Sequence, residues 1–305
     1  MKSKINKETS GNNMRLVTFR HENRERIGVQ LESHILDLSR VSARIPTDMK
    51  AFLSLGQAAL DQTHEVLASV KEEWLLAESD VTLLAPIPRP DKILCVGHNY
   101  AGHIGIGKTE LPEYPNLFSK TVNTITAHNQ PIVFPPVTTQ ADFEAELMAV
   151  IGKRAYQVSE SEAESCIAGY TIFNDVSARD YQKRTTQWML GKSFDTFGPM
   201  GQALVTTDEV PDPYSLHMEL TVNGVPQQRV NTGDMIFSVP YLISYTSQVM
   251  TLEVGDVIAT GTPSKLPEAA EQKRFLQPGD LVEITIEKLG ALRNTVQERN
   301  KGESQ

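Results

Sequence analysis

Alternating hydrophobic and polar positions predict many short β-strands along the chain. Residues 14–38 contain three runs of this kind at short spacing, as expected for a small antiparallel meander. Residues 215–222 and 225–230 alternate on either side of Asn223-Gly224, a dipeptide typical of a tight hairpin turn. Further strands are predicted at 92–96, 117–120, 132–134, 169–173, 256–260 and 280–286.

Hydrophobic residues recur at helical spacing in only a few places. Residues 48–76 carry such a pattern and predict a helix. Ser159 and Glu162 form a capping-box pattern that predicts a helix through Ala168, and a short helix is expected at 240–248. Many short strands with few long helices indicate a β-rich α+β protein.

Three prolines mark a boundary within the chain. Pro86, Pro88 and Pro90 stiffen the backbone and remove hydrogen-bond donors, so we expect a small N-terminal α+β domain to end near them. The predicted organisation is a disordered extension at 1–13, a small domain at 14–89, the main domain at 90–298 and a tail at 299–305.

Composition excludes several classes of partner. Hydrophobic residues make up 40% of the chain and charged residues 22%, as in ordinary globular proteins, and the net charge of −9 disfavours nucleic acid or an anionic membrane. Cys95 and Cys166 each lie in a hydrophobic segment, which favours two buried free thiols in a reducing cytoplasm over a disulfide. The sequence has neither a hydrophobic run of membrane-spanning length nor a signal-peptide core.

Candidate chemistry begins with two carboxylates on one predicted strand, residues 140–153. Glu144 and Glu146 are two positions apart, so their side chains point to the same face, with Cα atoms roughly 6–7 Å apart. Asp175 follows the strand predicted at 169–173 and adds a third acid. Three carboxylates form an oxygen-only ligand set that suits Mg²⁺, Mn²⁺ or Ca²⁺ better than zinc. The alternative is structural: two acids on a solvated strand face and an aspartate that caps a helix.

A phosphate-binding pattern is also present. Residues 102–109 match G-x-x-x-x-G-K-[ST] at every required position and raise the possibility of an NTPase. A phosphate loop must leave a strand directly and open a helix, but five residues separate this one from the strand, and Pro112 and Pro115 obstruct a following helix. A glycine-rich loop over a pocket is the favoured interpretation.

Five motifs in order resemble the fumarylacetoacetate hydrolase family over about residues 90–296. They are Gly97-x-Asn99-Tyr100-x-x-His103, Phe143-Glu144-x-Glu146-Leu147, Asn174-Asp175-Val176-Ser177-Ala178-Arg179-Asp180, Gly191-Lys192-Ser193-Phe194-Asp195 and Thr260-Gly261-Thr262-Pro263. The likeness is greatest to the branch with acylpyruvate hydrolases, oxaloacetate decarboxylases and tautomerases. It implies a mixed β-sandwich roll, a homodimer, and Mg²⁺ or Mn²⁺ held by Glu144, Glu146 and Asp175.

The same resemblance implies roles for other residues. Lys192 corresponds to a family lysine that neutralises charge beside the metal, whereas the remaining matches are positions that orient the substrate: Lys120, Arg179, Gln182 and Thr262. The structural alternatives are that Arg179 pairs with Asp180 and that Thr262 serves only its turn. A 2-oxo acid would chelate the cation, which would stabilise the enolate formed by C–C cleavage or enolisation.

His103 corresponds to the histidine that activates water in hydrolytic members of the family. Those members have a glutamate three residues later, where this chain has Ile106, and Ser264-Lys265-Leu266-Pro267 replaces a glycine-valine-glycine turn. The leading interpretation is a hydrolase that cleaves a C–C bond in a small 2-oxo or 1,3-diketo acid. Ile106 favours the alternative, an oxaloacetate-type decarboxylase or keto–enol tautomerase, because neither needs an activated water. A metal-binding homologue without activity is the remaining hypothesis.

Overall fold

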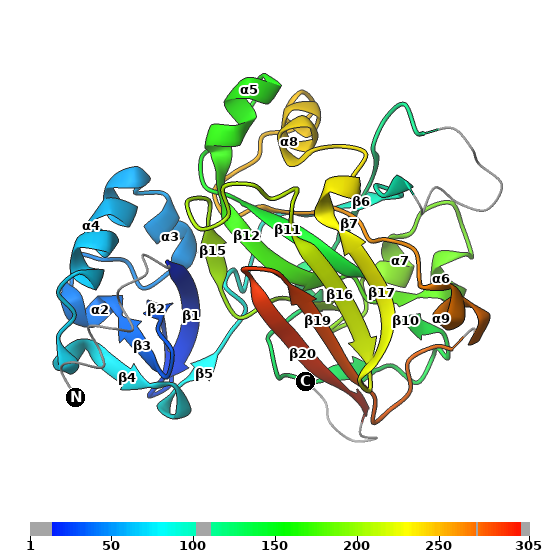
Figure 1. The fold of residues 1–305 in the computed structure, drawn as a ribbon, viewed down its shortest axis with the longest axis horizontal. Coiled ribbons are helices and arrows are strands. Elements are labelled where there is room, and N and C mark those ends of the chain that lie inside the picture. Colours follow the sequence, from blue (N-terminus) through cyan, green and yellow to red (C-terminus); the bar gives the residue numbers. More distant parts are fainter. Residues whose placement is uncertain (1–13, 102–110, 273, 300–305) are drawn as a thin grey trace.

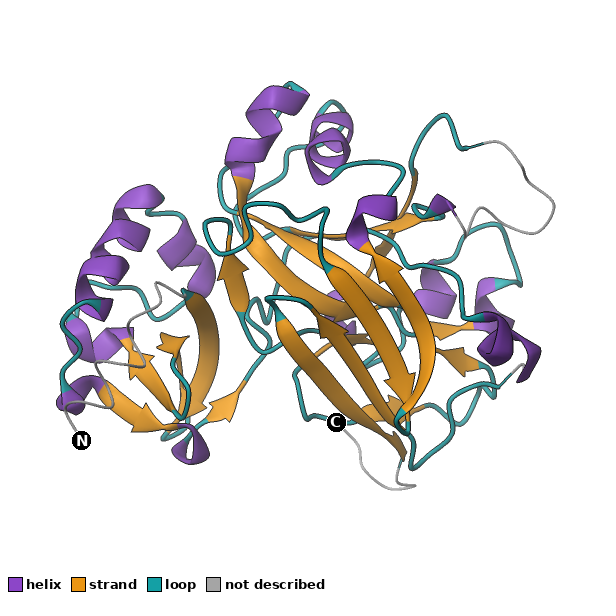
Figure 2. Cartoon of the chain, in the orientation of Figure 1, coloured by secondary structure: helices purple, strands orange, loops and turns teal. Residues whose placement is uncertain are grey.

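Two β-sheets and a few short peripheral helices build the molecule. The computed structural model describes residues 14–101, 111–272 and 274–299. In Figure 1 the strands and helices nearest the N-terminus gather at one end, and the strands nearest the C-terminus lie across the main body. Figure 2 shows that strands form the interior of both parts while helices lie around them. The β-rich α+β class is therefore confirmed.

The larger sheet has eleven strands and runs through both ends of the molecule. Its order is β4-β3-β2-β1-β15-β12-β11-β18-β6-β7, with β5 paired to β1. The strands of residues 14–89 thus join the strands of the main body through the antiparallel pairing of β1 with β15. The strands are β1 (Arg15–His21), β2 (Arg24–Gln30), β3 (His34–Asp37), β4 (Leu75–Ala77), β5 (Thr82–Leu83), β6 (Ile93–Gly97), β7 (Asn116–Lys120), β11 (Ala145–Ile151), β12 (Ile167–Asn174), β15 (Leu204–Thr206) and β18 (Val257–Ala259).

A five-stranded sheet of order β17-β16-β19-β20-β9 forms the second layer. Its strands are β9 (Ile132–Phe134), β16 (His217–Val222), β17 (Val225–Asn231), β19 (Leu281–Ile286) and β20 (Gly290–Glu298). Two small pairs complete the strands: β10 (Ala141–Asp142) with β13 (Ser177–Ala178), and β8 (Ile125–Thr126) with β14 (Gly198–Pro199).

The helices are short and lie outside the sheets. They are α2 (Leu38–Val41), α3 (Met49–Leu53), α4 (Gln57–Leu67), α5 (Glu160–Ala163), α6 (Arg179–Gln182), α7 (Met189–Lys192), α8 (Val239–Ser247) and α9 (Pro267–Gln272). Single 3-10 turns are η1 (Glu72–Trp74), η2 (Glu78–Asp80), η4 (Val122–Thr124), η5 (Glu164–Cys166) and η6 (Thr232–Asp234). No helix among the residues described is long and hydrophobic enough to cross a membrane.

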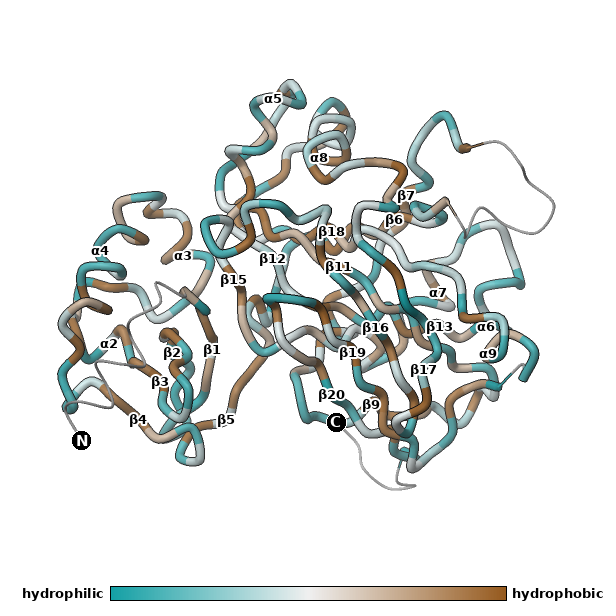
Figure 3. The backbone as a smooth tube through the Cα atoms, viewed as in Figure 1, coloured by the Kyte–Doolittle hydropathy of each residue, from teal (hydrophilic) through white to brown (hydrophobic). Residues whose placement is uncertain are grey.

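Strand β11 is buried on both faces and separates two hydrophobic clusters. Leu147 and Ala149 pack in one cluster with residues of the five-stranded sheet such as Ile284. Met148 and Val150, which point the other way, pack in a cluster that includes strands and helices of the N-terminal part. Figure 3 shows the hydrophobic stretches along the strands and more hydrophilic stretches on α4 and α5. The strand that carries Glu146 is therefore held rigidly from both sides.

Two helix predictions were too long. The helix expected at 48–76 is divided because Gly56 adopts φ of 69°, a left-handed conformation that ends α3 before α4 begins. The capping box at Ser159 is present, but α5 ends at Ala163 because Ile167 already pairs with Ile151 in the sheet. The hairpin at Asn223-Gly224 is confirmed, since β16 and β17 pair on either side of it.

Two further expectations concern strands and cysteines. Strand β20 was not predicted, and it rather than β19 carries the second sheet onward to β9. Cys95 and Cys166 are free and buried, as expected. The division of the chain near Pro90 remains a prediction, because the larger sheet and one of its hydrophobic clusters draw residues from both sides of that position.

Acidification should destabilise the fold through His128. The backbone N–H of Arg293 donates to Nδ1 of this buried imidazole at 3.1 Å, and burial, aided by Arg293, lowers its pKa from 6.5 to about 4. Between these values the unfolded chain binds a proton that the folded chain does not, so stability falls as pH falls. When the pH is lowered from about 7 to about 5, the free energy of unfolding measured with urea should fall by about 1–2 kcal/mol more in the wild type than in His128→Gln.

The control for this measurement is His217→Gln, which removes an exposed histidine from β16. That variant should keep the pH dependence of the wild type. Equal pH dependence in the wild type and in His128→Gln would contradict the role assigned to the buried imidazole.

Candidate active site

Paired strands β11 and β12 bring the three predicted acids together at one end. Ala145 is opposite Asn174 in the register, so Glu144 and Asp175 are the next residues on each side. The N–H of Asp175 donates to the carbonyl of Glu144 at 2.9 Å, and the Asn174 side chain accepts from the N–H of Glu144 at 3.0 Å. No helix starts at Asp175, because residues 177–178 form β13, so the helix-cap alternative was wrong.

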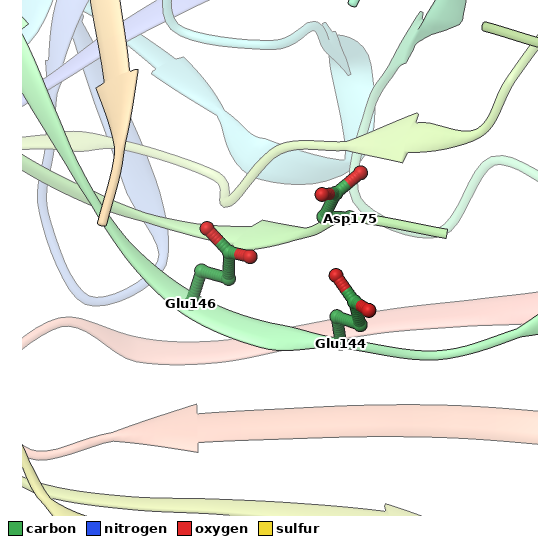
Figure 4. A group of neighbouring side chains, drawn as sticks. All are labelled: Glu144, Glu146 and Asp175. Carbon is green, nitrogen blue, oxygen red and sulfur yellow. The ribbon is translucent and has the colours of Figure 1, made fainter. Parts of the chain in front are cut away.

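The three carboxylates converge on one point. One oxygen from each of Glu144, Glu146 and Asp175 lies within 4.8 Å of the other two. Figure 4 shows the three side chains pointing toward one another. The residues are 6%, 1% and 0% exposed, respectively. Burying three acids side by side is unfavourable unless positive charge or protons balance them. The solvated strand face that we considered from sequence is therefore excluded.

Two buried lysines supply part of that charge. Lys192, at the end of α7, places Nζ 2.6 Å from Glu144 Oε2 and 2.6 Å from Asp175 Oδ2. Burial alone would lower the pKa of Lys192, but Asp175 and Glu144 outweigh it and raise the pKa. Lys120, at the end of β7, donates to Asp175 Oδ1 at 2.7 Å and to the carbonyl of Val176 at 3.0 Å. Burial dominates there, and the pKa of Lys120 is lowered.

Glu146 has a different environment from the other two acids. Its Oε2 accepts the N–H of Gly261 at 2.8 Å, and no lysine or arginine nitrogen of the described residues lies within 4.0 Å. Burial, and then Asp175 and Glu144, raise the pKa of Glu146 well above its ordinary value. Gly261 has φ of 97°, and a Cβ there would lie 2.8 Å from the Val96 carbonyl. The site therefore needs glycine at this position.

Arg179, the first residue of α6, is held on three sides. Its Nε donates to Asp142 at 3.0 Å, its Nη2 lies 2.7 Å from Glu144, and its Nη1 donates to Gln182 at 3.0 Å. Burial works against the charge, but Glu144 and Asp142 outweigh it and raise the pKa of Arg179. The expected alternative, pairing with Asp180, was wrong. Asp142 also accepts from Lys265 at 2.7 Å.

A glutamine connects Thr262 to the acidic strand. Gln228 donates through Nε2 to Thr262 Oγ1 at 2.9 Å and to the carbonyl of Pro263 at 2.6 Å. Its Oε1 accepts the N–H of Ala145 at 3.0 Å. Thr262 is 5% exposed and lines the same cleft as the acids, so its position reflects the site as well as the turn.

Glu144 and Glu146, but not Asp175, line a cleft of about 570 Å³. This volume suits a small organic molecule. Buried acids, Lys192 and Thr262 form part of its wall, and exposed residues of the segment after α6 form another part. The lining residues are Val96, Gly97, His98, Phe118, Asp142, Glu144, Glu146, Arg179, Gln182, Lys183, Thr185, Trp188, Lys192, Thr262 and Phe275.

The structure gathers most of the predicted site residues in or directly behind this cleft. Lys120 does not line it but contacts Asp175 from behind. His103, Ile106 and the phosphate-loop pattern at 102–109 lie outside the residues described. Sequence reasoning missed Asp142, Lys265 and Gln228. The sequence contained a hint for the first two. Asp142 belongs to the predicted strand that carries Glu144 and Glu146, and Lys265 lies in the turn whose sequence differs from that of other family members.

Comparisons with known proteins identify the family of the chain. The family model described as "Fumarylacetoacetate (FAA) hydrolase C-terminal" matches residues 92–297. The mitochondrial oxaloacetate tautomerase fahd2 of Xenopus laevis is 40% identical over 289 residues, which cover 93% of this chain and 90% of that protein.

Two solved structures are similar along nearly the whole chain. The fumarylacetoacetate hydrolase of psychrophilic Exiguobacterium antarcticum is 34% identical with a TM-score of 0.80, covering 94% of this chain and 100% of its own. The maleylpyruvate hydrolase of Sphingobium sp. SYK-6, in complex with manganese(II) and pyruvate, is 28% identical with a TM-score of 0.78, covering 93% and 99%.

Proposed function

The chain is an enzyme of the fumarylacetoacetate hydrolase family, and from that premise we propose that it enolises a small 2-oxo acid, with keto–enol tautomerisation of an oxaloacetate-type substrate as its reaction. The observation that carries this proposal is the buried group of Glu144, Glu146 and Asp175, of which Glu144 and Glu146 line the cleft. The tautomerase relative, 40% identical over 93% of the chain, supports the choice of reaction.

The acidic group fits a divalent cation. Its donors are carboxylate oxygens, which Mg²⁺ and Mn²⁺ prefer, and they are close enough together to share one ion. Glu146 has no lysine or arginine nitrogen within 4.0 Å among the described residues, so it is the acid of the group best placed to bind a cation. The manganese in the maleylpyruvate hydrolase structure supports the assignment without deciding between Mg²⁺ and Mn²⁺.

A bound cation would polarise the keto oxygen and stabilise the negative charge that develops there during enolisation. The protein's own residues surround that position. Lys192 lines the cleft and keeps a fixed positive charge beside the acids, while Lys120 neutralises Asp175 from behind. Arg179, Gln182 and Thr262 would orient the substrate along the wall of the cleft.

Tautomerisation is favoured because it requires no activated water. The family's hydrolytic members orient their histidine with a glutamate, and this chain has Ile106 at that position. Hydrolytic C–C cleavage is the second candidate, and both reactions are compatible with the comparisons. Two observations favour keeping it: His103 is present, and the chain is similar to a maleylpyruvate hydrolase over nearly its full length. The predicted homodimer and cytoplasmic location remain predictions, and the tautomerase relative is mitochondrial.

The proposal predicts a metal-dependent tautomerase. Oxaloacetate that is added as its enol should lose ultraviolet absorbance faster with enzyme and Mg²⁺ or Mn²⁺ than with buffer. EDTA should abolish the acceleration. Calorimetry should detect one divalent-cation site per chain independently of turnover.

Product analysis separates the candidate reactions. Pyruvate formation from oxaloacetate would identify decarboxylation, and cleavage of acetylpyruvate or fumarylpyruvate would identify hydrolysis. If none of these substrates reacts faster with enzyme and either cation, the proposed function is wrong.

A further inference from the structure

The charges around the acidic group balance without Lys183. Four acids gather there, and four cations contact them or lie beside them. The acids are Asp142, Glu144, Glu146 and Asp175, and the cations are Lys120, Arg179, Lys192 and Lys265. Every one of these cations is within hydrogen-bonding distance of a carboxylate, so its charge is already paired.

Lys183 lines the cleft together with Arg179 and Lys192, but unlike them it has no such pair. It lines the cleft and is exposed, and no carboxylate of the described residues lies within 4.0 Å of its Nζ. None of the other exposed or half-exposed lining residues is an acid: they are Gly97, His98, Phe118, Arg179, Gln182, Thr185, Trp188 and Phe275. The acids that line the cleft all belong to the balanced group. A substrate anion at this position would therefore meet one uncompensated positive charge.

The backbone holds Lys183 in place. Lys183 caps the C-terminal end of α6, and its N–H donates to the carbonyl of Arg179 at 3.1 Å. Helix α6 packs closely on α7 through Gly191, where a Cβ would lie 2.5 Å from the backbone nitrogen of Gln182. Lys183 therefore has a fixed attachment point one residue beyond Gln182 on the same wall.

The next residue provides a natural comparison. Arg184 carries the same charge, but its guanidinium lies 3.5 Å from the centre of the Tyr181 ring and the residue does not line the cleft. The two neighbours thus differ in where their charge is placed, while both are exposed.

We propose that Lys183 binds a second carboxylate of the substrate, so that the enzyme prefers 2-oxo acids with two negative charges over those with one. This inference rests on the proposed function, because it assumes that the 2-oxo carboxylate end occupies the acidic group. Lys183 is then a specificity-determining residue: it distinguishes a 2-oxo dicarboxylate from a monoanion of the same size.

The expected effect is moderate, because the lysine is exposed. Exposed ion pairs contribute little in water, and loss of one such contact lowers kcat/KM by about three- to tenfold. The attraction is also screened by salt, over a distance of about 10 Å at 0.1 M ionic strength. The preference for the dianion should therefore weaken as NaCl is added.

The test compares oxaloacetate with its 4-methyl ester, which has the same skeleton and one charge fewer. In Lys183→Met, kcat/KM for oxaloacetate should fall about three- to tenfold, while kcat/KM for the ester changes less than twofold. Arg184→Met, the matched control, should leave both unchanged. An equal loss for both substrates, or equal effects of the two variants, would overturn the inference.

A binding measurement separates this inference from the proposed function. The 3,3-difluoro derivative of oxaloacetate has no C3 proton and cannot enolise, so calorimetry with Mg²⁺-loaded enzyme measures its Kd without turnover. Lys183→Met should weaken binding of the derivative about three- to tenfold, and Arg184→Met should not. If the wild type binds the derivative in this way but does not turn over oxaloacetate, the proposed reaction fails and the role of Lys183 stands. Unchanged binding in Lys183→Met would overturn that role.

Discussion

Replacing Glu146 with glutamine should lower metal-dependent turnover of oxaloacetate by about a thousandfold. The substitution removes one of three carboxylates that converge within 4.8 Å, and metal stabilisation of a developing oxyanion is worth several kcal/mol, or about three powers of ten. Calorimetry should show a matching loss of affinity for Mg²⁺ and Mn²⁺. The fold should persist, because an amide oxygen can still accept the N–H of Gly261.

The same variant should be more stable than the wild type when no cation is added. Glu146 is 1% exposed beside two other acids, and glutamine removes its negative charge at nearly the same volume. Its melting temperature in EDTA should therefore rise, and that of Glu164→Gln, which changes an exposed glutamate in η5, should not. Full activity and metal affinity in Glu146→Gln would contradict the assigned site.

Replacing Lys192 with methionine should destabilise the metal-free protein by about 3–5 kcal/mol, because it leaves two buried carboxylates without their shared ammonium group. The Nζ of Lys192 lies 2.6 Å from both Glu144 and Asp175, and the residue is 1% exposed. Urea unfolding in EDTA measures the loss. Turnover should also fall steeply, since the fixed charge beside the reacting oxygen is gone.

Added Mg²⁺ should stabilise Lys192→Met more than it stabilises the wild type, because the cation then replaces the positive charge that Lys192 supplied to Glu144 and Asp175. Lys92→Met is the matched control. Lys92 pairs with the fully buried Asp256 at 2.7 Å, and neither residue lines the cleft. That variant should lose stability and gain no more from Mg²⁺ than the wild type. Equal gains in both variants would show that Lys192 is unconnected with the cation.

Local patterns were sufficient to find the acidic group but not its surroundings. Strand periodicity placed Glu144 and Glu146 on one face, the strand predicted at 169–173 led to Asp175, and the family motifs supplied Lys192 and Arg179. The pairing of Asp142 with Lys265 spans 123 positions, and no local pattern predicts which residues so far apart will meet. The same is true of Gln228, which joins Ala145 to Thr262 across two different elements.

Two errors in the predicted secondary structure, by contrast, have local causes. Strand β20 escaped prediction because a buried polar residue, Asn294, interrupts its hydrophobic alternation. The fold tolerates it, since its amide donates to the carbonyls of Ala127 and Gln130 at 2.9 and 2.7 Å. At Gly56 the pattern instead predicted too much regular structure. The hydrophobic spacing continues through the glycine, but its left-handed backbone divides the helix.

Strand β18 lies between β11 and β6 in the sheet, yet it is made long after both. Its residues Val257–Ala259 pair with β6 from residue 93 onward and with β11 from residue 148. During synthesis, a ribosome must therefore translate most of the chain before the centre of the sheet can close. Until then, β6 and β11 each expose an unpaired edge to solvent. The acidic group also needs Gly261, so it can assemble only late in synthesis. Because strands far apart in the sequence must pair, we expect the protein to fold slowly and to benefit from chaperones.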